Sequence, residues 1–138
     1  MSHIPLLLRK LVVRRAGNRC EYCQLSQNGQ EATFHVDHIV PLASGGETLA
    51  ENLALACVSC SLKKGAKEFV IDVVTKRKTK LFHPRKDIWN EHFEWQDVVV
   101  KAKTATGNAT LELLDLNRKL IVAIREEEIF LKRHPFNK

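Results

Sequence analysis

The residues with the most evident chemistry stand in one apolar stretch, FHVDHIVPLASGG, residues 34–46. Asp37 and His38 lie side by side at its centre, between apolar residues such as Phe34 and Ile39. Burial of a charged group is costly unless the charge is paired, so a strand that only filled a core would not usually carry this pair. An imidazole titrates near neutrality and can accept a proton. A carboxylate can hold a divalent cation that acts as a Lewis acid.

The four cysteines form two pairs of the C-x-x-C type, Cys20 with Cys23 and Cys57 with Cys60. In a chain without an export signal, two such pairs are typical of a tetrahedral zinc site rather than of disulfides. The alternatives are four buried free cysteines or a redox pair. We predict one structural Zn²⁺ held by four thiolates.

Composition limits the class of protein. The chain has 138 residues, 44% of them hydrophobic and 28% charged, which is typical of one compact soluble domain spanning residues 1–138. No apolar run reaches the roughly 18 residues of a membrane span. Residues 1–15 contain interrupting basic residues and do not resemble a signal peptide, so we expect no membrane partner and a cytoplasmic location.

The net charge of +6 suits a polyanionic partner, with nucleic acid first. Many basic proteins bind nothing anionic, so the charge does not decide the function by itself.

The first half of the chain predicts the elements that would position these residues. They are a helix over 4–16, a polar turn over 24–32, a strand over 33–40, a loop from Pro41 through Gly45-Gly46 to about Asn52, a short apolar segment over 53–56 and a helical turn over 62–67.

The second half predicts a smaller set of elements. They are strands over 69–74 and 79–83 joined by a basic tip at 75–78, a helical turn or mixed segment over 87–95, a strand over 97–104, and a helical region marked by Leu113, Leu116, Leu120, Ile124 and Leu131, with Gly107-Asn108 before it and Pro135 after it.

The order of motifs along residues 20–67 resembles the HNH nucleases, in the bacterial type whose core is braced by a four-cysteine zinc. The matching segments are RCEYC (19–23), VDHIVPLASGG (36–46), ENLALAC (51–57) and CSLKKG (60–65). The resemblance implies an α+β fold, with a ββα-metal (HNH, or His-Me finger) core, flanking helices and a small β hairpin. Residues 68–138 would be a C-terminal extension of that core.

The resemblance also implies roles. His38 would be the general base and Asp37 a ligand of a catalytic divalent metal, Mg²⁺, Mn²⁺ or Ni²⁺. Asn52 would tie the loop down and help to orient the base; the alternative is an ordinary cap or turn. Neighbouring side chains of a strand point to opposite faces, so Asp37 and His38 can serve one phosphate only if the strand ends or bends there.

The sequence departs from the family pattern at Ser61, where many relatives carry Asn or His directly after the last cysteine. A hydroxyl is a weak ligand for a divalent cation. The metal would be held through Ser61 and waters, or through another residue. His83 is the first candidate, followed by His92 and by His35, which shares the strand face of Asp37.

Nucleic-acid contacts are expected from basic residues at and after the second cysteine pair, namely Lys63, Lys64, Lys67 and Arg77. Lys64 matches the lysine that the family carries four residues after the last cysteine. The alternative for any one of them is a solvated charged surface. Trp89, Phe93 and Trp95 are spaced like a packing cluster, which we favour over base stacking.

These features lead to three hypotheses about function. The first is a metal-dependent endonuclease that hydrolyses phosphodiester bonds of nucleic acid, DNA first. The second, a non-catalytic zinc-stabilised nucleic-acid-binding module, leaves the Asp37-His38 pair and the spacing to Asn52 unexplained. The third, a zinc-stabilised protein-interaction domain, explains least.

Overall fold

The computed structural model describes residues 3–135 and divides them into two compact units. The N-terminal unit comprises residues up to Glu68 together with His83–Lys86, and the C-terminal unit comprises Phe69–Phe82 and the residues from Asp87 onward. The assignment of one domain with a C-terminal extension stays a prediction. Across residues 3–135, no helix has the length and apolar character needed to span a membrane.

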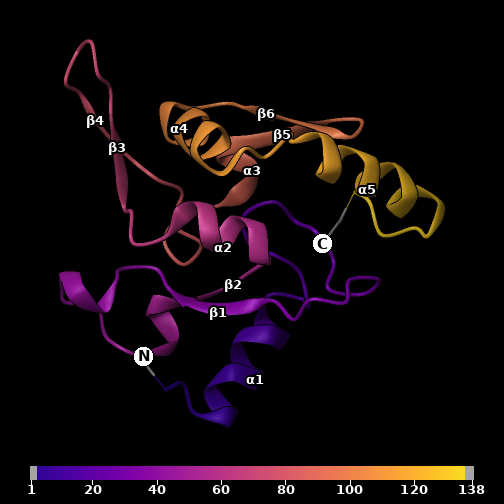
Figure 1. Ribbon diagram of the computed structural model, residues 1–138, viewed down its shortest axis with the longest axis horizontal. Helices are drawn as coiled ribbons and strands as arrows, with labels where there is room; N and C mark the ends of the chain where they lie inside the picture. Colours follow the sequence, from indigo (N-terminus) through magenta and orange to yellow (C-terminus); the bar gives the residue numbers. More distant parts are fainter. Residues whose placement is uncertain (1–2, 136–138) are drawn as a thin grey trace. The chain divides into compact units, whose positions relative to one another are not determined.

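The centre of the N-terminal unit is an antiparallel hairpin of β1 (His35–His38) and β2 (Leu53–Ala56), with His38 opposite Leu53. Helices α1 (Leu6–Arg15) and α2 (Val58–Lys64) lie on opposite sides of this hairpin (Figure 1). All four residues of β2 are buried. The expected strand–loop–strand–helix order is therefore present, and it places the end of β1 beside the start of β2.

Helix α1 confirms the N-terminal helix, but only part of its apolar face is buried. Ile4 and Val12 are buried, whereas Leu7 is 81% exposed. The guanidinium of Arg15 fastens the end of the helix, because it donates to the backbone oxygens of Ala50 and Leu53 at 2.9 and 2.8 Å.

Helix α2 begins earlier than the sequence indicated. The predicted turn began at Leu62, but the helix starts at Val58, so the second cysteine pair belongs to its first turn. The reason is local: the Sγ of Cys57 accepts a hydrogen bond from the backbone amide of Cys60 and caps the helix. Gly65 ends the helix, with φ +53°.

The C-terminal unit contains two hairpins and three helices within the described residues. They are β3 (Phe69–Ile71) paired with β4 (Lys78–Lys80), α3 (Trp89–His92), β5 (Phe93–Gln96) paired with β6 (Val99–Ala102), α4 (Ala105–Leu114) and α5 (Lys119–Phe130). The predicted hairpin with a basic tip is confirmed.

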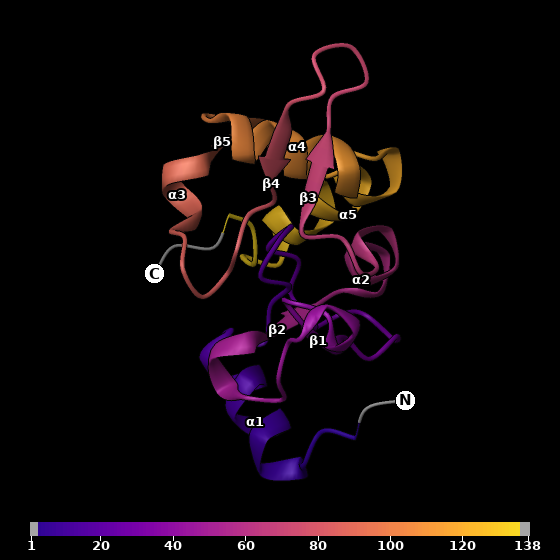
Figure 2. The same cartoon turned by 90° about the vertical axis from the view of Figure 1, so that its left-hand side faces the viewer.

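The tip of the β3–β4 hairpin extends beyond α4 (Figure 2). Asp72 orders it without an Asn-Gly turn, because its Oδ1 accepts the backbone amides of Val74 and Thr75 at 2.9 and 2.8 Å. These two hydrogen bonds stabilise the ionised carboxylate and therefore lower the pKa of Asp72.

The C-terminal helical region is two helices, and Gly107 lies inside the first rather than before it. Thr104 caps α4 by accepting the amide of Gly107 at 2.9 Å. A Cβ at Gly107 would stand 2.2 Å from the backbone oxygen of His92, so this position requires glycine for close packing. Two of the leucines that marked this region are exposed, Leu120 by 70% and Leu131 by 56%, and Leu131 follows the last residue of α5.

The aromatic residues of α3 and β5 pack on one another. The ring of Trp89 lies 5.0 Å from that of Phe93 and 5.3 Å from that of Trp95, centroid to centroid. Phe93 is buried. These contacts support the packing interpretation of the cluster.

Arg125 connects three segments of the C-terminal unit by hydrogen bonds. Arg125→Met is expected to destabilise this unit by about 3 kcal/mol. The buried guanidinium donates to the backbone oxygens of Val98 and Leu116 and to Oδ1 of Asn117 at 2.9, 2.7 and 3.2 Å. Methionine preserves the aliphatic stem but removes all three of these hydrogen bonds. Urea unfolding measures the change, with the exposed Lys119→Met as the matched control. A loss below about 1 kcal/mol would contradict the expectation.

Candidate functional site

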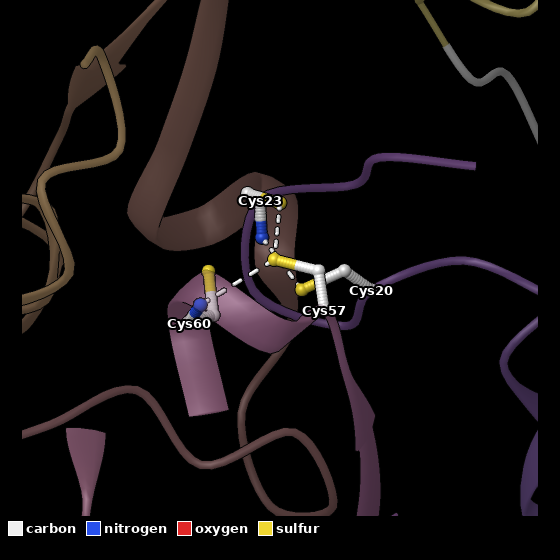
Figure 3. A group of neighbouring side chains, drawn as sticks. All are labelled: Cys20, Cys23, Cys57 and Cys60. Atoms are coloured by element: carbon white, nitrogen blue, oxygen red, sulfur yellow. Dashed lines mark hydrogen bonds between the residues drawn. The ribbon is translucent and has the colours of Figure 1, made fainter. Parts of the chain in front are cut away.

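The four cysteine side chains converge on one point in the N-terminal unit. All four are buried, and their sulfur atoms lie within 4.8 Å of one another (Figure 3). The Sγ atoms of Cys23 and Cys57 are 3.7 Å apart. Tetrahedral zinc with bonds of about 2.3 Å would separate its sulfur ligands by about 3.8 Å. The cluster therefore fits a tetrahedral metal ion, as the spacing of the cysteines predicted.

The two cysteine pairs share one local geometry. In each, the first sulfur accepts the backbone amide of the second cysteine: Cys20 from Cys23 and Cys57 from Cys60, both at 3.4 Å. The first pair is attached to β2, because the amide of Glu21 donates to the oxygen of Leu55 and the Glu21 carboxylate accepts the amide of Leu55, both at 2.9 Å.

The Glu21 carboxylate also pairs with the guanidinium of Arg85 within the same unit. Burial lowers the pKa of Arg85 to about 10, and the nearby charge of Arg15 adds to the shift. The pairing with Glu21 supplies the opposite charge that this partly buried cation requires.

The electrostatics of the cluster indicate a cation. Burial raises the pKa of the Cys20 thiol, whereas hydrogen bonds from neighbouring thiols, Cys20 first, lower the pKa of Cys57. Ionisation of all four requires a compensating ion in the centre, and zinc, with its preference for thiolates, fits.

His38 is the last residue of β1, so the strand ends where the sequence required it to end. Its imidazole is half-buried, and Nε2 lies 2.9 Å from the hydroxyl oxygen of Thr48. That hydrogen bond orients the ring. Sequence reasoning missed Thr48, because a threonine in a polar loop carries no signal of a tertiary contact.

Asn52 fastens the chain immediately after His38. Its Oδ1 accepts the amide of Val40 at 2.9 Å, and its Nδ2 donates to the oxygens of Val40 and Glu47 at 3.0 and 2.9 Å. The backbone oxygen of Asn52 accepts the amide of Ile39 at 2.8 Å. These bonds tie the two ends of the loop together, beside the strand end that carries the imidazole.

Gly46→Ala is expected to disrupt this arrangement and to destabilise the N-terminal unit by about 3 kcal/mol. A Cβ at Gly46 would stand 1.9 Å from the oxygen of Val40 and 2.9 Å from Nδ2 of Asn52, so backbone must move. Gly45→Ala is the matched control. Its Cβ would meet nothing within 4 Å, and only its φ of +89° costs energy, about 1 kcal/mol. Urea unfolding compares them, and equal losses would contradict the clash.

Asp37 projects from the opposite face of β1 to His38, by the alternation of strand side chains. Its half-buried carboxylate accepts no hydrogen bond from the residues between 3 and 135. Burial lowers the pKa of Lys64, and the charge of Asp37 is the main effect that opposes the shift, so the two side chains lie near each other. Asp37 is thus a carboxylate with capacity for a cation.

Lys64 is buried, and its Nζ donates to the backbone oxygen of Ile39 at 3.2 Å. This contact is internal, which differs from the surface position expected of a residue that tracks phosphates. Lys63, Lys67 and Arg77 are exposed. Their nucleic-acid contacts stay predictions.

The candidate third ligands have different partners in the structure. Ser61 lies 2.8 Å from Nδ1 of His35, oxygen to nitrogen. Nδ1 of His83 accepts the backbone amides of Arg85 and Lys86, both at 3.2 Å, and so orders its own turn. His92 belongs to the C-terminal unit, where its Nδ1 lies 2.6 Å from the hydroxyl of Thr104. Of these histidines, the structure brings His35 to Ser61.

Comparison with known proteins agrees with this geometry. Residues 20–67 match the family model described as HNH endonuclease. Septu protein PtuA of Bacillus mycoides (strain KBAB4) is 25% identical over 150 aligned residues, which cover 88% of this chain and 20% of the relative. Septu protein PtuB of Bacillus thuringiensis is 22% identical over 113 aligned residues, which cover 80% of this chain and 41% of the relative.

This chain thus spans well under half the length of either relative. No solved structure matches it. The matched residues contain both cysteine pairs, Asp37, His38 and Asn52. Residues 20–67, the part of the chain that contains these side chains, are thus similar to the HNH endonuclease family.

Proposed function

We propose that the N-terminal unit is a metal-dependent endonuclease that hydrolyses phosphodiester bonds of nucleic acid, with DNA as its first substrate. The observation that carries the proposal is the position of His38. Its imidazole stands at the end of β1, held by Thr48, while Asp37 occupies the other face of the strand. A binding module would have no need for an oriented imidazole beside an available carboxylate.

In this mechanism His38 accepts the proton of the attacking water. Asp37 is the carboxylate that would hold a divalent cation, Mg²⁺, Mn²⁺ or Ni²⁺, which supplies Lewis acidity for the charge that develops on the phosphate. Asn52 maintains the position of His38 through the backbone of Ile39 and Val40. The four cysteines would hold a metal ion that keeps α2 and the first cysteine pair in place.

The remaining ligands are proposals of unequal support. Ser61 lies on α2, the helix that packs against β1, and is within reach of the strand face that carries Asp37. For His83 the structure shows Nδ1 engaged with the backbone amides of its own turn.

The nucleic-acid backbone would lie along the exposed lysines of α2 and the segment after it, Lys63 and Lys67. In the C-terminal unit, the exposed Arg77 of the β3–β4 hairpin is a separate candidate contact. Phosphate contacts release counterions, so binding should weaken steeply as salt rises. Lys64 would instead fix the strand end, since its ammonium is bonded to Ile39.

A plasmid-cleavage assay tests the proposal. The zinc-loaded full chain is incubated with supercoiled DNA and Mg²⁺, Mn²⁺ or Ni²⁺, and the expected result is nicking that a chelator abolishes. Parallel reactions with single-stranded DNA and RNA define the substrate. Salt-sensitive gel shifts without nicking under any metal would favour the zinc-stabilised binding module and overturn the enzyme.

A further inference from the structure

The face of β1 that carries Asp37 also carries an imidazole. Residues two apart on a strand share a face, so His35 and Asp37 point the same way and His38 points the other way. Both His35 and Asp37 are half-buried. The contacts of α2 show which element covers this face.

Helix α2 covers the face through two side chains. Ser61 and Lys64 are three residues apart and therefore lie on one side of the helix. The Ser61 hydroxyl is 2.8 Å from Nδ1 of His35, and the Lys64 ammonium is bonded to the oxygen of Ile39 at 3.2 Å and lies in the field of Asp37. His35 and Asp37 thus both face α2, beside the residue that follows the last cysteine.

We infer that His35 is the metal ligand that completes the catalytic site with Asp37, and that Ser61 is a positioning residue for His35 rather than a ligand. This inference rests on the proposed function. The hydrogen bond to Ser61 occupies Nδ1, which leaves Nε2 of His35 as the nitrogen for a cation. An orienting partner on the second ring nitrogen is the usual companion of a histidine ligand.

The donor set has a consequence for the choice of metal. An imidazole and a carboxylate favour transition metals, whereas Mg²⁺ prefers oxygen ligands alone. Binding should therefore be tighter for Mn²⁺ and Ni²⁺ than for Mg²⁺. A site made of Asp37, the Ser61 hydroxyl and water has oxygen ligands alone. It would lack the preference for Ni²⁺ over Mg²⁺ that an imidazole ligand adds.

Metal affinity, measured apart from cleavage, tests the assignment. Mn²⁺ is titrated into the zinc-loaded full chain, and free Mn²⁺ is followed by electron paramagnetic resonance. His35→Ala should weaken binding about 100-fold and Ser61→Ala about tenfold, because the hydroxyl only orients the ring. Ser61→Thr, which keeps the hydroxyl, should bind like the wild type. His83→Ala tests the other candidate ligand, and a loss of affinity in this variant would overturn the assignment. The matched control is His3→Ala, which removes an exposed imidazole of the same unit and should leave the affinity unchanged.

Each alternative has its own result. Unchanged affinity in His35→Ala, or a loss in Ser61→Ala as large as that in His35→Ala, overturns the assignment. If His35→Ala fails to retain its zinc, His35→Gln gives the same readout, because its amide can still hydrogen-bond Ser61 but lacks the imidazole. If the wild type binds Mn²⁺ through His35 but does not cleave nucleic acid, the proposed nuclease activity is refuted and the assignment of His35 as a metal ligand is supported. Zinc-loaded wild type that binds no Mn²⁺ overturns both proposals.

Discussion

Removal of the metal from the four-cysteine site, or Cys57→Ser, is expected to unfold the N-terminal unit. The site joins the first cysteine pair, the end of β2 and the start of α2, and its four sulfurs are buried. Structural zinc binding contributes about 10–16 kcal/mol in small zinc domains, which is as large as the whole stability of a typical domain, about 5–15 kcal/mol. Without the ion, the thiols must stay protonated in an apolar interior and the helix loses its anchor.

Metal content and amide exchange test this expectation together. The purified protein should hold one tightly bound zinc, and Cys57→Ser should lose both the zinc and the exchange protection of β2 and α2. Ser59→Ala, a change between the two cysteines of the second pair, is the matched control and should keep both. A metal-free protein with protected β2 amides would refute the structural role of the site.

His38→Ala is expected to reduce metal-dependent cleavage by about 10²–10⁴-fold. Alanine removes the imidazole that is proposed to take the proton of water, while Asp37 and the cysteines stay in place. Thr48→Val should cause a smaller loss, because it preserves the imidazole and removes only the hydrogen bond at 2.9 Å that orients it. Both are measured as initial rates of plasmid nicking at saturating Mn²⁺.

The control for this substitution is His3→Ala, which removes an exposed imidazole of the same unit. Added imidazole in solution should restore part of the activity of His38→Ala and none of the activity of Asp37→Ala, which removes the proposed metal ligand. Nicking by His38→Ala at the rate of wild type would show that another group is the base.

Local rules were enough for most of the elements. The apolar period of residues 4–16 marks α1, the turn residues mark the loop between β1 and β2, and the β-branched residues mark the β3–β4 hairpin. They failed where an element boundary depends on a partner. Gly107 looks like a helix stop by itself, yet it lies inside α4 because only glycine fits against the backbone of His92.

Local rules also could not rank residues of one type. Lys63 and Lys64 are adjacent and chemically identical, but Lys63 is exposed and Lys64 is buried against Ile39. Adjacent side chains of a helix point in different directions, and only that of Lys64 points toward β1. The leucines of α1 and α5 show the same limit. Their period is apolar, but the exposure of Leu7 and Leu120 depends on whether another element covers them.

By itself, the sequence determined the chemistry of this protein: two cysteine pairs for a metal, an Asp-His pair at a strand end, and a glycine pair and an asparagine to close the loop. Each depends on residue type and short spacing, which the chain carries locally. The tertiary structure decided which groups meet. The partners of His38, Asn52 and Ser61 are Thr48, Val40 and His35, at sequence separations of 10, 12 and 26. Contacts over such separations exist only after β1, β2 and α2 have packed, so no local pattern could encode them.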